Sequence, residues 1–218
     1  MSSATAQSYL RFPLTRLLGN GGNIRVLRAM MSYGAPLSAV QLSRDTGLTR
    51  QGVRLVLQGL ETQGLVTAHG VPRSQLFSVV SDHPFTAALT TMFEQERGRW
   101  ELLNQTLREA LHANPEVRSA WLYGSVARGE DAPHSDIDIA IVTQTDGAGV
   151  AEAVRETLQA LDDRLMVHFS VVALTPADVA RLRPDDHWWR EMTKDAKVLK
   201  GVGPQQEALR CARPALPA

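Results

Sequence analysis

The stretch GSVARGEDAPHSDID, residues 124–138, decides how the C-terminal part of this chain folds. One apolar run, residues 120–123, precedes it and another, residues 139–142, follows it, which is typical of two strands joined by a polar connection. A Gly-Ser turn that leaves a strand presents backbone N–H groups and a hydroxyl to a phosphate. Two aspartates spaced one apart on a strand place both carboxylates on one face, where Mg2+ takes oxygen ligands. The stretch therefore predicts a nucleotide and metal site.

Strands and helices alternate around this stretch. We expect strands over 117–123, 136–142 and 166–173, a short helix from Ser125, a helix over 150–165, and a further helix that Thr175 caps. The alternation predicts a domain over residues 115–200 with a mixed sheet and flanking helices, within an overall α+β chain. Residues 201–218 are expected to form a flexible tail.

Charge is divided unevenly along the chain. Residues 1–80 carry eight arginines against Asp45 and Glu61, whereas the remaining residues carry 15 basic and 21 acidic side chains. A basic first third joined to an acidic remainder predicts two modules with different partners.

The basic third has the pattern of three helices and a hairpin. Apolar positions predict a helix over 23–33, a second over 39–45 capped by Ser38, and a third that Thr49 caps and that runs to about Gln63. Two short apolar stretches, 65–67 and 75–79, follow and enclose a basic tip, which predicts a hairpin.

Residues 20–80 resemble the winged helix-turn-helix of bacterial transcription regulators, through the segment 39–57 and the turn at Leu60, Gly64, Leu65 and Val66. The resemblance implies binding to double-stranded DNA, and dimers of such domains bind sites with two-fold symmetry, so we expect a homodimer. A module for protein docking or dimerisation is the alternative. The implied DNA-binding residues are Thr49, Arg50, Gln51 and Arg54 at the start of the recognition helix, Arg73 on the wing, and Arg44 near the DNA backbone.

Residues 82–113 connect the two modules. Their apolar positions recur at helical spacing, which predicts one long helix, or two helices divided at Gly98. The apolar face of this connector serves packing or, alternatively, a dimer seam.

Gly124-Ser125, followed after ten residues by Asp136-Ile137-Asp138, resembles the signature of minimal nucleotidyltransferases in the DNA polymerase β superfamily. Arg128-Gly129 and Ser135 also fit the usual form of that family, and the resemblance covers about residues 115–175. It implies that Gly124 and Ser125 hold the β- and γ-phosphates of ATP or another NTP, and that Asp136 and Asp138 bind Mg2+ at the catalytic centre. Arg128 and Ser135 join the nucleotide-binding residues, although Arg128 is alternatively only a helix-end charge.

The third acidic side chain that active members of this family supply from a neighbouring strand is missing. The matching strand, residues 166–172, contains no Asp or Glu. Ser170 is the best match to the missing acid, and His168 lies on the same face of that strand. Histidine is either a base or a hydrogen-bonded structural group here, and it is a poor partner for Mg2+.

Two functions follow from these features. The first is a DNA-binding protein that binds NTP and Mg2+ and transfers a nucleotidyl group to a hydroxyl of a protein, an RNA or a small molecule. The second is a transcriptional regulator whose transferase-like domain is inactive and senses a nucleotide. Enzyme activity stays open. The single cysteine, Cys211, and the lack of an apolar run of about 20 residues favour a cytoplasmic protein without a membrane segment.

Overall fold

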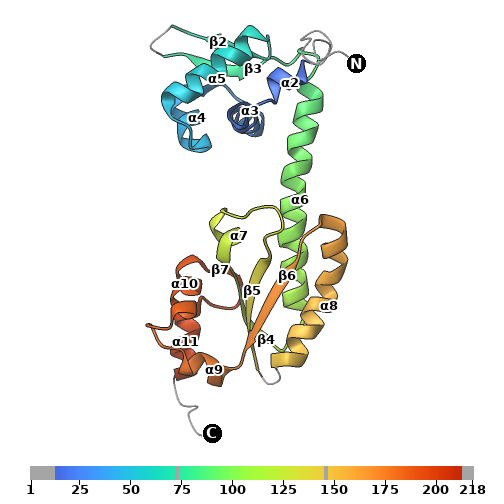
Figure 1. Ribbon diagram of the computed structural model, residues 1–218, viewed down its shortest axis with the longest axis vertical. Helices are drawn as coiled ribbons and strands as arrows, with labels where there is room; N and C mark the ends of the chain where they lie inside the picture. The colour runs from blue at the N-terminus through green and yellow to red at the C-terminus, as the bar shows by residue number, and fades with distance from the viewer. Residues whose placement is uncertain (1–12, 72–73, 145–146, 213–218) are drawn as a thin grey trace, which may run out of the picture. The chain divides into compact units, whose positions relative to one another are not determined.

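A computed structural model describes residues 13–71, 74–144 and 147–212, apart from the side chains of residues 160–165. The chain divides into two compact units, residues 1–98 and 99–218 (Figure 1). The fold is α+β, as predicted. The division falls inside the expected connector, so the connector does not form a unit of its own.

The first unit is a winged helix-turn-helix. Helices α2 (Leu14–Leu17), α3 (Gly21–Tyr33), α4 (Ala39–Thr46) and α5 (Arg50–Thr62) are followed by the hairpin of β2 (Val66–His69) and β3 (Leu76–Val79). A short strand β1 (Leu37–Ser38) pairs with β3 and completes an antiparallel sheet of order β1-β3-β2. Helices α3 to α5 enclose a core whose members include Val26, Leu42 and Leu57.

Local capping explains where these helices begin. The Ser38 hydroxyl accepts a hydrogen bond from the Gln41 backbone N–H, and the Gln41 side-chain oxygen accepts one from the Ser38 backbone N–H. The Thr49 hydroxyl accepts from the Gly52 N–H at 3.0 Å and starts α5. Both predicted caps are therefore confirmed.

Helix α6 (Thr86–Ala113) is one continuous helix through Gly98 rather than two. Its first part packs Leu89 and Phe93 into the core of the first unit, and its second part packs Leu103 and Leu107 into the core of the second. No helix among the described residues is long and apolar enough to cross a membrane.

The second unit is built on a four-stranded sheet of order β6-β5-β4-β7. Strands β5 and β6 run parallel, and the other neighbours run antiparallel. The strands are β4 (Val117–Tyr123), β5 (Ile137–Thr143), β6 (Phe169–Leu174) and β7 (Lys197–Lys200). The helices are the second part of α6, α7 (Gly124–Arg128), α8 (Gly147–Leu165), α9 (Pro176–Arg181), α10 (His187–Asp195) and α11 (Pro204–Ala212).

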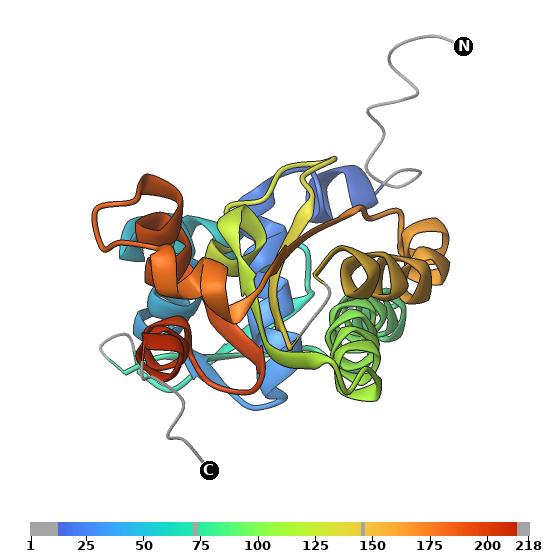
Figure 2. The same ribbon diagram turned by 90° about the horizontal axis from the view of Figure 1, so that it is seen from below.

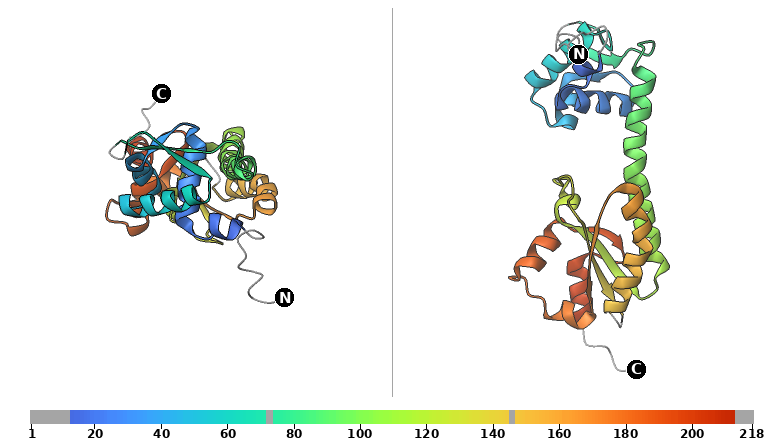
Figure 3. Two further views of the ribbon diagram at one scale, coloured as in Figure 1. Left: turned by 90° about the horizontal axis from the view of Figure 1, so that it is seen from above. Right: turned by 45° about the vertical axis from the view of Figure 1, so that its right-hand side comes forward.

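The helices of this unit cover the two faces of the sheet. Helices α6 and α8 pack on one face against side chains that include Ile139 and Ile141, whereas α9 and α10 pack on the other against Trp121 and Ala140 (Figure 2; Figure 3, right). Each strand therefore alternates between two apolar environments, which explains why β5 is apolar on both sides along most of its length.

Two expectations need correction. The strand predicted from residue 166 begins at Phe169, and Met166 before it has a left-handed backbone with φ 52°. Residues 204–212, expected within a flexible tail, form helix α11. The reason is a contact distant in sequence: the Glu207 side chain is fully buried, pairs with Arg118 at 2.7 Å and accepts a hydrogen bond from the Ser119 hydroxyl at 2.9 Å. Residues 213–218 lie outside the described part.

Candidate functional site

Asp138 lies in the second residue of β5, between Tyr123 of β4 and Ser170 of β6. The register pairs Asp138 with Tyr123 across the antiparallel ladder and with Ser170 across the parallel ladder. Because side chains at paired positions share a face, these three residues stand side by side on the sheet. Ala140, two residues further along β5, packs against α9 and α10, so the three residues face the α10 side. Ser170 is therefore the β6 residue beside Asp138, and its match to the missing acid stays a prediction.

Asp136 is exposed and lies one residue before β5. The turn that leads into it is closed by Ser135, whose hydroxyl accepts a hydrogen bond from the Ala132 N–H at 3.0 Å. The Ser135 N–H in turn donates to the Ala132 carbonyl at 3.0 Å. In the described structure Ser135 therefore holds the turn, and its predicted role in nucleotide binding stays a prediction.

Gly124 begins α7 directly after β4 and contacts the Asp138 carboxylate closely. Its φ of 76° lies in the left-handed region, and an added Cβ would overlap the Asp138 Oδ2 atom. Only glycine meets both conditions. The close approach joins the two halves of the sequence motif, the Gly-Ser pair and the aspartate pair, at one place. Ser125, the next residue, is half-buried in the first turn of α7.

Arg128 ends α7 and is tied to two carboxylates. Its Nε donates to Glu130 at 2.7 Å and its Nη1 donates to Asp195 of α10 at 2.8 Å. The two hydrogen-bonded carboxylates, Glu130 first and then Asp195, raise the pKa of the Arg128 guanidinium. These two pairs do not decide between a phosphate contact and a helix-end charge for Arg128, so its role in nucleotide binding stays a prediction.

The electrostatics of Asp138 differ from those of a surface carboxylate. Burial raises the pKa of Asp138, and the neighbouring charge of Asp136 raises it further, while Arg128 lowers it. A partly desolvated carboxylate that is repelled by a second carboxylate gains from a bound cation. The arrangement therefore fits a cation at Asp136 and Asp138.

Sequence reasoning missed the aromatic side of this site. Tyr123 contacts Trp188 of α10 edge to face, with ring centroids 5.9 Å apart. Burial raises the pKa of the Tyr123 phenol, and the Asp138 charge also raises it. No motif marks Trp188 or Asp195, because both reach the site through packing between segments distant in sequence. Tyr123 directly precedes Gly124, but as the end of an apolar run it gave no sign of a place in the site.

The neighbouring strand supplies no carboxylate to this site. Ser170 is half-buried at the position beside Asp138, and His168 is exposed one residue before β6. The His168 backbone carbonyl accepts a hydrogen bond from the Ile137 N–H at 2.8 Å. Among the residues that the structure describes, no group of three or more His, Cys, Asp or Glu side chains could hold a metal ion.

Two carboxylates fit one Mg2+ that arrives with a nucleotide. Mg2+ in phosphate-transfer sites is held by one or two carboxylates, by water and by phosphate oxygens, rather than by a complete protein cage. Asp136 and Asp138 meet this requirement by residue type. Two-metal transfer sites place a second metal about 4 Å from the first; within the described part of the chain, no third carboxylate joins Asp136 and Asp138 to hold one.

The predicted DNA-binding residues lie on the first unit. Arg50, Gln51 and Arg54 are exposed on the first two turns of α5, and Thr49 caps that helix. Arg44 on α4 is also exposed, and its Nε lies 3.8 Å from the Asp45 carboxylate. Arg73 lies outside the described residues.

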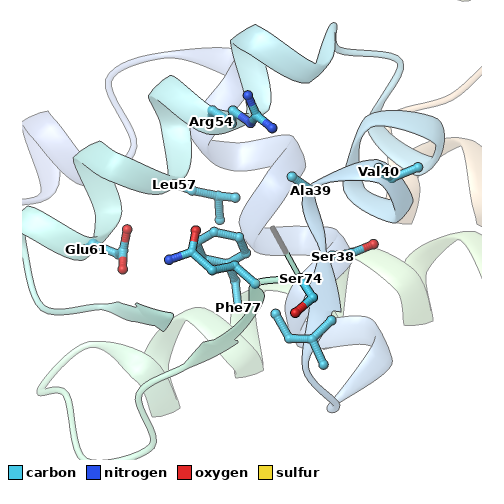
Figure 4. Close-up of a pocket in the computed structure, with 10 residues that line it drawn as sticks. Ser38, Ala39, Val40, Arg54, Leu57, Glu61, Ser74 and Phe77 are labelled. Atoms are coloured by element: carbon cyan, nitrogen blue, oxygen red, sulfur yellow. The ribbon is translucent and has the colours of Figure 1, made fainter. Parts of the chain in front are cut away.

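A groove runs beside Arg54, between α5, the start of α4 and strand β3. It encloses a cavity of ≈ 520 Å³ whose lining includes Ser38, Arg54, Glu61 and Phe77. Figure 4 shows Arg54 and Glu61 on the same helix, with Leu57 between them. Among the residues that the structure describes, the lining of the groove thus carries one cation and one anion beside α5.

Comparison with known proteins identifies one domain by family. Residues 105–183, less than half of the chain, match the family model described as polymerase beta, nucleotidyltransferase. No curated protein matches the chain.

Several solved structures resemble parts of the chain at low identity. A toxin–antitoxin structure with AMP-PNP is 20% identical, over 50% of this chain and 83% of that chain, with a TM-score of 0.37. The antimony-specific transcriptional repressor AntR is 22% identical, over 48% of this chain and 86% of that chain, with a TM-score of 0.36. NadR in complex with 4-hydroxyphenylacetate is 18% identical, over 48% of this chain and 75% of that chain, with a TM-score of 0.35. Similarities this distant do not bear on what this chain binds.

The family match agrees with the predicted resemblance and includes the whole stretch from Gly124 to Asp138. The fold of the first unit agrees with the other predicted resemblance. By family and by fold, the chain therefore contains a polymerase β-like nucleotidyltransferase domain joined to an N-terminal winged helix-turn-helix.

Proposed function

We propose that this protein is a DNA-binding regulator whose polymerase β-like domain binds a nucleoside triphosphate with Mg2+ and transfers the nucleotidyl group slowly or not at all. The observation that carries this proposal is the serine beside Asp138. Ser170 lies beside Asp138 across the parallel ladder, and we assign it to the position from which active relatives supply the third carboxylate. A site that keeps Gly124, Asp136 and Asp138 without that acid is suited to binding rather than to transfer.

The nucleotide part of the proposal assigns roles to five residues. Gly124 and Ser125 hold the β- and γ-phosphates, and Asp136 and Asp138 hold the Mg2+ that neutralises phosphate charge. Arg128 is tied to Glu130 and Asp195, which supports a role in fixing α7 against α10. ATP or another NTP fits this chemistry, since none of these groups selects a base.

Transfer requires more than this set of residues. The attacking hydroxyl must lose its proton, and charge must be stabilised on both the attacking and the leaving oxygen. The Ser170 hydroxyl is a much weaker base than a carboxylate and carries no charge to hold a second metal ion. His168 is the candidate base that precedes β6, where its side chain is exposed, and we assign it a structural rather than a catalytic role.

The DNA part rests on the exposed arginines of α5 and α4 in an otherwise acid-poor unit. Arg44, Arg50 and Arg54 contact phosphates or base edges of double-stranded DNA, while Thr49 fixes the start of the recognition helix. We propose a homodimer on a two-fold site, in the cytoplasm. Light scattering of the pure protein, with and without DNA, tests the dimer.

A binding and transfer assay tests the nucleotide part. The protein is titrated with Mg2+ and ATP, GTP, CTP or UTP in a calorimeter, and it is incubated with labelled NTPs and candidate protein or RNA acceptors. We expect binding without rapid transfer, and loss of binding in Asp136→Asn/Asp138→Asn. Absence of nucleotide binding by the native protein would refute the nucleotide site.

Transferase activity is the second candidate function, because the aspartate pair that defines the family is present. Ser170→Asp places a carboxylate beside Asp138 and distinguishes the two candidates. If Ser170 is the reason for weak transfer, Ser170→Asp gains label transfer with Mg2+, and Ser170→Asn does not. Rapid transfer by the native protein would overturn the regulator proposal in favour of the enzyme.

A salt titration tests the DNA part. For each phosphate contact that is lost, the slope of log K against log salt falls by about 0.9 for duplex DNA. Arg50→Ala/Arg54→Ala is therefore expected to weaken binding and to flatten the slope. Unchanged salt-sensitive binding in this variant would refute the assignment of α5 to DNA.

A further inference from the structure

Helix α5 carries two rows of side chains on opposite sides. The buried row is Val53, Leu57 and Leu60, each at most 1% exposed. These positions follow the i, i+4, i+7 spacing that aligns residues on one helix face. Shifting this row by two residues turns it by about 200°, because each residue of an α-helix adds about 100°. The shifted row therefore points away from the core.

That outward row is Gln51, Leu55 and Gln58, which we call the outward row of α5. All three residues are exposed, and Leu55 is 60% exposed. Arg54, the neighbour of Leu55, is exposed as well. The apolar side chain of Leu55 thus stands between the amides of Gln51 and Gln58 and points away from the core of the unit. The proposed function assigns this helix to DNA binding.

The chemistry of the row matches one type of base pair. In the major groove adenine offers its N7 acceptor and N6 donor to the amide of Gln or Asn, and thymine offers its C5-methyl group to an apolar side chain. A G·C pair presents no methyl group there, and guanine is read chiefly by Arg or Lys. Gln51 and Leu55 are four residues apart, a rise of about 6 Å, so both side chains reach into a short run of base pairs.

We propose that the outward row of α5 reads A·T pairs, with Leu55 in contact with the C5-methyl group of a thymine and Gln51 bonded to an adenine. The proposal rests on the DNA-binding part of the proposed function and adds the class of sequence that is recognised. The arginines supply affinity for any duplex, whereas Gln51 and Leu55 supply the preference. Leu55 is thereby a specificity-determining residue.

Removal of single methyl groups from DNA tests the proposal. The native protein first enriches its preferred duplexes from a random duplex library. The enriched duplex is then made again with deoxyuridine in place of thymine at one position at a time, which deletes the C5-methyl group and leaves the base pairing unchanged. We expect one such replacement to weaken binding about three- to fivefold, since one buried methyl group is lost.

The variant Leu55→Ala identifies the protein partner of that methyl group. Because Leu55 is exposed and alanine favours helices, the variant is expected to fold, which circular dichroism checks. It should bind the thymine and deoxyuridine duplexes equally well. Leu209→Ala, in the second unit, is the matched control, since Leu209 is an exposed leucine too, 68% exposed, and should leave the methyl preference intact.

The outcomes separate this proposal from the one on which it rests. Binding to DNA with no sensitive thymine, or a methyl preference that persists in Leu55→Ala, would overturn the role of Leu55 and leave DNA binding in place. Enriched duplexes without A·T pairs would overturn it as well. A protein that binds no duplex at all would refute the DNA-binding proposal and this inference together.

Discussion

Replacing Gly124 by alanine should damage the nucleotide site by pushing on Asp138. Two effects add in this variant. Gly124 has a φ of 76°, where alanine costs about 1–2 kcal/mol. In addition, the new Cβ would overlap Asp138 Oδ2, so the carboxylate must leave its rotamer at a further cost of about 0.5–1.5 kcal/mol.

Gly129 provides a matched control for the strain alone. Its φ of 71° is nearly the same and it also flanks α7, but an added Cβ meets no atom within 4 Å. Gly129→Ala therefore carries the backbone cost without the contact. At about 4 °C for each kcal/mol, we expect Gly129→Ala to lower the Tm of the second unit by about 4–8 °C, and Gly124→Ala by about 6–14 °C.

The decisive assay is nucleotide affinity in the presence of Mg2+, measured by calorimetry on both variants and the native protein. The displaced carboxylate should weaken binding by Gly124→Ala at least tenfold, about 1.4 kcal/mol, whereas Gly129→Ala stays near the native value. Equal affinities in the two variants, at whatever stability, would refute the argument that Gly124 is required for the position of Asp138.

Three further predictions concern the second unit. Burial and Asp136 raise the folded-state pKa of Asp138, so this carboxyl group favours folding at low pH and loses that contribution as the pH rises through its folded pKa. Asp138→Asn should therefore raise the Tm at pH 7 without Mg2+, but not near pH 3. A lower Tm of this variant at pH 7 would contradict the raised pKa. Arg118→Met leaves the buried Glu207 carboxylate without its partner at 2.7 Å and should lower the free energy of unfolding, measured with denaturant, by about 3 kcal/mol. Arg210→Met is the control and should lower it by less than about 1 kcal/mol, because the Arg210 guanidinium is 3.9 Å from Glu207. Similar losses in the two variants would refute the importance of the buried pair. Lys200 Nζ donates to the Leu111 and Asn114 carbonyls at 2.8 and 2.9 Å, so Lys200→Met should cost about 1–3 kcal/mol by the same measurement, while the exposed Lys197→Met should have little effect.

Much of the first unit could be predicted because its signals are local. Ser38 and Thr49 cap helices through contacts three residues away, and the apolar spacing of residues 53–60 defines the buried side of α5. The outward row of α5 follows from the same helical spacing, but the sequence analysis named only Thr49, Gln51 and the arginines of this helix as DNA-binding residues. Leu55 was missed because an apolar residue on a predicted helix does not reveal its exposure until the packing of that helix is known.

The second unit shows where local signals end. Strands β4 and β5 and the turn at Gly124 could be predicted from one contiguous stretch. Helices α10 and α11 and strand β7 were not predicted, since their stability comes from contacts such as Trp189 in the sheet-facing cluster and Glu207 with Arg118. The roles of Gly124, Ser125, Arg128, Ser135, Asp136, Asp138, His168 and Ser170 in nucleotide chemistry stay predictions.

The motif, the helix caps and the two modules could be predicted from the chain, because each depends on residues close together in it. Only the folded structure shows which distant groups meet. It paired Ser170 with Asp138 across a parallel ladder, brought Asp195 to Arg128, and placed Trp188 against Tyr123. Sheet register and helix packing fix these contacts through the burial of whole faces, and no local spacing in the chain encodes them.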